Sequence, residues 1–133
     1  MNKNHIYNID NSRNYKYPRA SMQSLRNYSK MLSSKDGEEW LFEAQARYNK
    51  EFFNTIPGFI SLTNKRLVFE PAITSVINSS ILDIDLKHIS NIKKTSGLIF
   101  LPNSFKVYIN DGKSYSFTTW KRDFIISILN KFL

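Results

Sequence analysis

The residues of this sequence that could do chemistry are mostly cations, and they fall into short groups along the chain. The candidate binding residues are Arg47 and Lys50, the adjacent Phe52 and Phe53, Lys65 and Arg66, Lys93 and Lys94, and Lys121 and Arg122. A basic residue near an anionic surface contributes on the order of 1 kcal/mol of attraction, so about four to six together would support weak, salt-sensitive docking. These groups therefore predict an anionic partner.

The pair Phe52–Phe53 is the sharpest hint of a membrane contact. Two adjacent aromatic side chains in one loop cannot both point into one core, so one of them is free to insert into a membrane as an apolar wedge. The alternative is that one ring caps the end of the fold while the other lies on the surface. For Lys65 and Arg66 the alternative is a solvated hairpin tip without a binding role.

Residues suited to catalysis are scarce. The two histidines, His5 and His88, are far apart and the chain has no cysteine, so no common metal-binding spacing occurs. Asp83 and Asp85 share one strand face, but a solvated outer face explains them more simply than a catalytic carboxylate pair. With only four glycines, the chain has no glycine-rich phosphate loop. The sequence predicts a protein that is not an enzyme and uses no cofactor or metal.

Length and charge narrow the class of protein further. A chain of 133 residues suits one domain with a core, and its net charge of +8 favours a polyanionic partner. The longest apolar run, near Leu98–Leu101, is far shorter than the roughly 20 residues of a membrane-spanning helix. The N-terminus lacks the apolar segment of a secretory signal. We therefore expect a cytoplasmic protein, with peripheral membrane association as an option.

The first 37 residues differ in composition from the remainder. Residues 1–37 hold seven Lys and Arg against two Asp, a net charge of +5, and are rich in Asn, Ser and Tyr. We interpret 1–37 as a basic N-terminal extension, disordered or loosely attached over 1–17 and able to form an amphipathic helix over 19–33. Because Tyr15, Tyr17 and Arg19 mix aromatics with cations, nucleic-acid binding remains a distant third alternative.

Residues 38–133 show the alternating pattern of a mainly β domain. Apolar and polar residues alternate in about seven short segments, a pattern typical of an antiparallel barrel or sandwich. Two hairpins are marked, one by Thr63-Asn64-Lys65 and one by Asn110-Asp111-Gly112. The last segment has apolar residues at helical spacing, which predicts a C-terminal amphipathic helix over 119–132 that closes the barrel, with Trp120 buried as its first anchor.

Three motifs in this order resemble the GRAM domain, a family with a pleckstrin-homology-like (PH-like) fold. They are "GFISLTNKRLVFEP", "ILDIDLKHISNIKK" and "INDGKSYSFTTWKRDFIISIL". The chain is similar in particular to small bacterial GRAM-domain proteins. The resemblance covers roughly residues 38–133 and implies two packed antiparallel sheets with a C-terminal helix. It also implies a lipid- or protein-binding module rather than an enzyme, and it draws attention to the loop "NKEFFNTIP", which relatives use for headgroups.

Two functions follow as expectations. The first is peripheral binding of anionic membrane lipid through the basic loops. The second is protein binding, either by a partner strand added to the edge of the sheet or by docking on the helix face. High salt separates the two, because exposed charge contacts are screened within about 8 Å at physiological ionic strength.

Overall fold

The computed structural model describes residues 15–17, 34–51, 54–72, 81–95 and 103–133. Seven antiparallel strands form one sheet in the order β4-β3-β2-β1-β7-β6-β5. The strands are β1 (Trp40–Glu51), β2 (Asn54–Thr63), β3 (Arg66–Pro71), β4 (Leu82–Asp85), β5 (Ile89–Thr95), β6 (Ser104–Ile109) and β7 (Ser114–Thr118). A short 3-10 turn, η3 (Leu86–His88), links β4 to β5, and the helix α2 (Arg122–Leu129) follows β7. The expected mainly β fold with a closing helix is confirmed.

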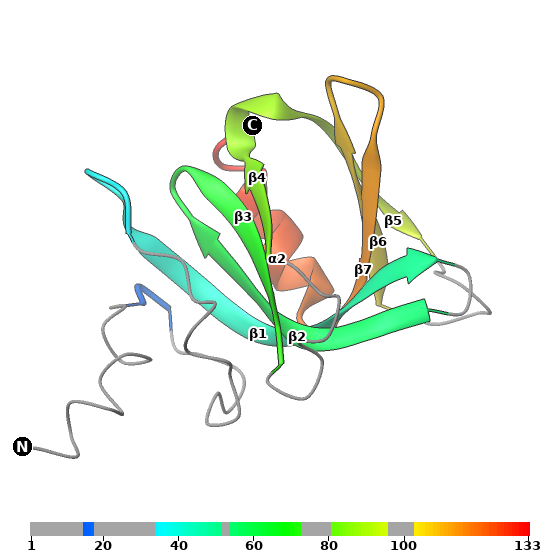
Figure 1. The fold of residues 1–133 in the computed structure, drawn as a ribbon. Coiled ribbons are helices and arrows are strands. Elements are labelled where there is room, and N and C mark those ends of the chain that lie inside the picture. Colours follow the sequence, from blue (N-terminus) through cyan, green and yellow to red (C-terminus); the bar gives the residue numbers. More distant parts are fainter. Residues whose placement is uncertain (1–14, 18–33, 52–53, 73–80, 96–102) are drawn as a thin grey trace, which may run out of the picture.

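The sheet bends around α2, and β1 makes the bend possible. Along one edge β1 pairs with β2 from Trp40 to Glu51, whereas on the other edge it pairs with β7 only at Arg47 and Tyr48. The two halves of the sheet therefore diverge on either side of β1, and α2 lies between them (Figure 1). Ile125, Ile128 and Leu129 of α2 are almost completely buried in the resulting core.

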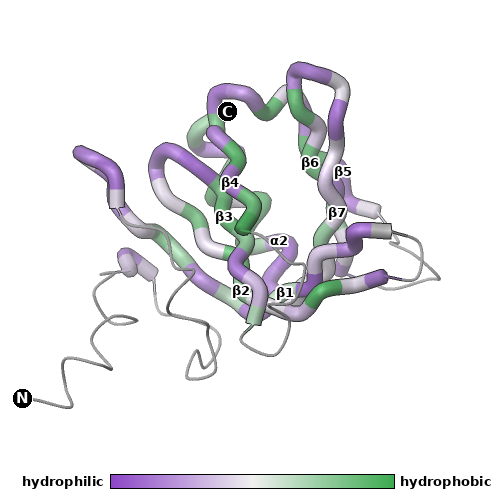
Figure 2. The backbone as a smooth tube through the Cα atoms, viewed as in Figure 1, coloured by the Kyte–Doolittle hydropathy of each residue, from purple (hydrophilic) through white to green (hydrophobic). Residues whose placement is uncertain are grey.

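Alternation along β6 separates the core from the outer surface. In β6, Phe105 and Val107 are fully buried, whereas Lys106 and Tyr108 between and after them are partly exposed. Phe105 also packs against Phe117 of β7, with ring centroids 5.6 Å apart. Hydrophilic residues gather at the turns, most visibly at the tip between β6 and β7 (Figure 2). The fold thus follows the period-two pattern that the sequence shows.

Gly58 is a position in β2 where only glycine fits. A Cβ there would lie 2.3 Å from the carbonyl oxygen of Glu70 and 2.9 Å from the Cα of Pro71, both on β3. Backbone atoms cannot move aside as a flexible side chain can, so any side chain would push β2 and β3 apart. The glycine that opens the first of the three motifs is therefore required by the close approach of two strands.

The start of the C-terminal helix differs from the prediction. The helix begins at Arg122 rather than near 119, and Trp120 is 86% exposed instead of buried as its first anchor. The cause is a turn in which the N–H of Arg122 donates to the carbonyl of Thr119, 3.1 Å away. Trp120 lies inside this turn, so the helical spacing that links it to Phe124 in the sequence does not continue into the structure.

Lys16 and Tyr17 of the N-terminal extension contact the sheet and α2. The N–H groups of Lys16 and Tyr17 donate to the carbonyls of Trp40 and Leu41, and Tyr17 packs edge-on against Phe124. At these positions the chain contacts the sheet, whereas the expectation that 1–17 is disordered or loosely attached stays a prediction. The boundary between a 1–37 extension and a 38–133 domain stays a prediction, and the helix expected over 19–33 lies outside the described residues.

Candidate functional site

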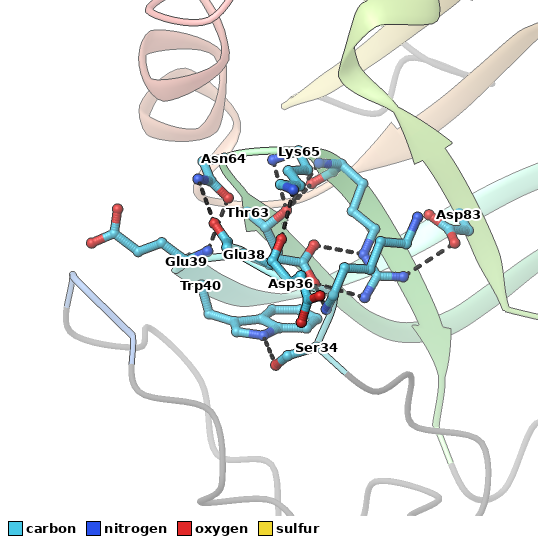
Figure 3. A network of polar contacts seen from close by, with 12 residues as sticks. Ser34, Asp36, Glu38, Glu39, Trp40, Thr63, Asn64, Lys65 and Asp83 are labelled. Carbon is cyan, nitrogen blue, oxygen red and sulfur yellow. Dashed lines mark hydrogen bonds and ion pairs between the residues drawn. The ribbon is translucent and has the colours of Figure 1, made fainter.

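The turn between β2 and β3 is tied to the segment that leads into β1. The side-chain oxygen of Asn64 accepts from the N–H of Glu39 at 2.9 Å, and its amide nitrogen donates to the carbonyl of Gly37 at 3.2 Å. The ammonium group of Lys65 donates to the carbonyl of Asp36 at 2.6 Å. Figure 3 shows these side chains pointing towards the segment. These hydrogen bonds therefore hold the turn between β2 and β3 against the segment that precedes β1.

Arg66, the first residue of β3, adds buried contacts to the same segment. Its guanidinium makes a two-pronged contact with Glu38, Nε to Oε2 at 2.7 Å and Nη2 to Oε1 at 2.9 Å. A third contact joins Nη1 to a carboxylate oxygen of Asp83 on β4 at 3.1 Å (Figure 3). The side chains of Arg66 and Glu38 are 2% and 0% exposed, and Arg66 also lies over the ring of Trp40. We call Glu38, Arg66 and Asp83 the polar clasp.

Electrostatics in the polar clasp favour the charged forms. Burial alone would raise the pKa of Glu38, but hydrogen bonds from Arg66 and from the N–H of Lys35 outweigh it and hold the pKa below its ordinary value. Burial would likewise lower the pKa of Arg66, but Glu38 and then Asp83 keep it raised. Glu38 and Arg66 therefore stabilise each other in their charged forms. Arg66 is not a surface cation, so as a candidate for binding a partner it is withdrawn.

A second group of cations surrounds the start of α2. Asp123 in the first turn of α2 contacts Lys94 at the end of β5, Nζ to Oδ1, at 3.2 Å. The same carboxylate oxygen lies 3.0 Å from Nε of Arg122, whose Nη1 also donates to the carbonyl of Ser104. The side chains of Lys94 and Asp123 are 56% and 67% exposed. Two predicted cationic groups that are far apart in the sequence thus meet on the surface.

Strand register brings Arg47 and Lys121 to the same end of the sheet. Arg47 on β1 is paired with Thr118, the last residue of β7, and Thr118 is paired in turn with Ser104, the first residue of β6. Lys121 follows three residues after Thr118, and both Arg47 and Lys121 are exposed. We call Arg47, Lys94, Lys121 and Arg122 the basic corner.

The other predicted cations lie elsewhere. Lys93 is on the outer face of β5, opposite Lys106 of β6 and with its ammonium group 5.8 Å from the centre of the Tyr108 ring. Lys50 is exposed in an irregularity of β1 between Asn49 and Glu51. Lys65 lies at the opposite end of β1, roughly 35 Å of strand away from Lys50 at about 3.3 Å per residue. Phe52 and Phe53 lie outside the described residues.

Asp123 sets the charge of the basic corner. Hydrogen bonds from Arg122 and then from Lys94 lower its pKa, so the carboxylate stays ionised and neutralises part of the surrounding charge. The four cations and this one carboxylate sum to three net positive charges; Lys94, Arg122 and Asp123 are in direct contact, whereas strand register alone places Arg47 and Lys121 at the same end of the sheet. This arrangement can attract an anion.

Two surface residues were missed by reasoning from sequence. Lys106 could have been found, because alternation along "SFKVYIN" puts it on the outer face with Tyr108. Trp120 could not have been found, because its helical spacing with Phe124 predicted a buried position. Among the described residues, no cluster of three His, Asp or Glu side chains could hold a metal ion. No helix in the described ranges is long and apolar enough to cross a membrane.

The family model of the GRAM domain matches residues 26–133, and the chain belongs to this family. No curated protein matches the sequence. A similar solved structure is the C-terminal domain of an unknown protein from Leishmania infantum, with a TM-score of 0.59 and 20% identity over 73% of this chain and 85% of that one. The Vps36 N-terminal PH domain gives a TM-score of 0.54 and 18% identity over 74% and 80%.

The DH/PH domains of p115-RhoGEF give a TM-score of 0.56 at 8% identity, over 71% of this chain and 30% of that longer one. At these identities the likeness shows the fold alone, which is PH-like. The family and the fold together make the chain a binding module of the GRAM type.

Proposed function

We propose that this domain binds anionic membrane lipid peripherally, with the basic corner as the contact surface. The observation that carries the proposal is the convergence of Lys94 and Arg122 on Asp123, with Arg47 and Lys121 at the same end of the sheet. Two strands, β1 and β5, together with the turn before α2 and the start of α2 supply these cations. A chain that needed them only for solubility would have no reason to gather them.

The expected strength of this contact is modest. Three net charges at about 1 kcal/mol each give roughly 3 kcal/mol of attraction to an anionic surface. This corresponds to about a 150-fold preference for an anionic over a neutral membrane. Binding of this kind is reversible and weakens with salt, because exposed charges are screened.

The test is sedimentation of the purified chain with vesicles. We expect binding to phosphatidylcholine vesicles that contain phosphatidylserine, little binding to phosphatidylcholine alone, and loss of binding as salt rises towards molar concentration. Lys121→Glu reverses one exposed charge of the basic corner and should weaken binding about tenfold or more, at about 1 kcal/mol for each unit of charge changed.

Lys113→Glu is the matched control for charge. Lys113 is also exposed but lies in the turn between β6 and β7, at the opposite end of these strands from Ser104 and Thr118. Equal losses for Lys113→Glu and Lys121→Glu would mean that net charge matters and the basic corner does not. If the unmodified chain binds no anionic vesicle at low salt, the lipid proposal is wrong. Protein recognition at the sheet edges, β4 and β5, is then the function to test.

A further inference from the structure

The chain has two tryptophans, of which one is buried and the other is exposed. Trp40 is 3% exposed, and its indole N–H donates to the hydroxyl of Ser34 at 2.6 Å. Trp120 is 86% exposed, immediately before Lys121 and Arg122 of the basic corner. A large aromatic ring left in water forgoes the stabilisation of burial, so an exposed Trp is more informative than an exposed cation.

The turn that carries Trp120 is held at both ends. The N–H of Thr119 donates to the carbonyl of Asn103 at 2.9 Å, and the Thr119 hydroxyl donates to the carbonyl of Gln45 on β1 at 2.7 Å. Asn103 has a positive φ of 62°, a conformation that asparagine tolerates better than most residues. After the turn, Arg122 is fixed to the carbonyl of Ser104. Trp120 is thus presented outward on a fixed support.

We propose that Trp120 is the residue of the basic corner that enters the membrane, inserting its ring at the level of the lipid headgroups. This inference rests on the proposed function and adds an apolar component to it. A membrane suits this surface because tryptophan favours the interface between headgroups and hydrocarbon, while the cations beside it match anionic headgroups. Because the turn is already fixed, insertion orders little additional chain.

Intrinsic fluorescence reports on Trp120 directly, because the other tryptophan is buried. Vesicles of phosphatidylcholine with phosphatidylserine should shift the emission to shorter wavelength and protect it from acrylamide. Trp120→Phe keeps an aromatic ring but removes the reporter, so the remaining emission, from Trp40, should not respond to vesicles. Trp120→Ala should weaken vesicle binding about fivefold to tenfold, with less salt dependence than Lys121→Glu, because the lost contribution is apolar burial.

Phe132→Ser is the matched control. Phe132 is also an exposed aromatic residue, at 44%, but it follows the opposite end of α2. Its replacement should leave vesicle binding unchanged. Circular dichroism should show that Trp120→Ala and Phe132→Ser both keep the fold.

The possible results separate this inference from the proposed function. Vesicle binding with a blue shift that Trp120→Phe abolishes supports insertion. Binding without any shift, or unchanged binding by Trp120→Ala, overturns insertion and leaves a purely electrostatic contact in place. Absence of binding by the unmodified chain overturns both. Equal losses from Trp120→Ala and Phe132→Ser would also overturn insertion, since the location of the exposed aromatic side chain would then not matter.

Discussion

The polar clasp and the basic corner both include cations from the short basic groups of the sequence, yet these cations have opposite environments in the fold. In the clasp, Arg66 is 2% exposed and meets two carboxylates. In the corner, Lys94 and Arg122 share the single exposed carboxylate of Asp123, while Arg47 and Lys121 face solvent. A cation that contacts two carboxylates inside the fold stabilises the structure. Cations that share one exposed carboxylate remain available to bind a partner.

Removing Glu38 should have the largest effect, and the effect should be on stability. Glu38→Ala removes the carboxylate that makes the two-pronged contact with buried Arg66, and breaking a buried pair in this way costs about 3–5 kcal/mol of unfolding free energy. Urea unfolding measures this loss. Glu39→Ala, at the adjacent exposed position, should cost less than about 0.5 kcal/mol. Similar losses for the two variants would contradict the polar clasp.

Acid should reduce the stability that Glu38 contributes through the polar clasp. The pKa of Glu38 is lower in the folded chain than its ordinary value of about 4.5, so the folded state releases this proton more readily than the unfolded state does. The stabilisation is therefore complete above pH 4.5 and is lost as pH falls through the folded-state pKa. Thermal unfolding against pH should show a smaller acid loss for Glu38→Gln than for the unmodified chain. An identical acid loss in both would mean that Glu38 is not the group responsible.

At the basic corner, removing the carboxylate should increase binding. Asp123→Asn raises the net charge of the corner by one and frees Lys94 and Arg122 to meet headgroups. At about 1 kcal/mol for one charge, affinity for anionic vesicles should rise about fivefold. Titration with vesicles at low salt measures this. Weaker binding would show that Asp123 positions the cations instead of competing for them.

The smallest expected effect is that of Trp120 on stability. Because its side chain is 86% exposed, Trp120→Ala should change the unfolding free energy by less than about 0.5 kcal/mol. Urea unfolding, compared with Glu38→Ala in the same buffer, gives the contrast between the two regions. A loss of several kcal/mol would place Trp120 in the core, as the helical spacing of the sequence suggested.

Much of the fold was predictable because it follows local patterns. The alternation in "SFKVYIN" and the Asn110-Asp111-Gly112 turn indicate β6, β7 and their hairpin without any long-range information. Near Trp120 the local pattern was misleading. The bond from Thr119 to Gln45 joins residues 74 positions apart, and no helical spacing reveals such a constraint.

The site was less predictable than the fold. The cation groups were visible in the sequence, but their partners were not. Arg66 forms an ion pair with Glu38, 28 residues earlier, whereas Lys94 and Arg122 form ion pairs with Asp123. Only strand order and register, which place the end of β5 beside the start of α2, distinguish a cation held in the fold from one on a shared surface.

The most direct test of the account compares charge reversal at the two regions. Lys65→Glu changes the turn next to the polar clasp and Lys121→Glu changes the basic corner, each by the same two units of charge. The measurement is the affinity of each variant for vesicles of phosphatidylcholine with phosphatidylserine at low salt. The account predicts about tenfold or greater weakening for Lys121→Glu and little change for Lys65→Glu. Equal weakening, or a larger effect of Lys65→Glu, would contradict it.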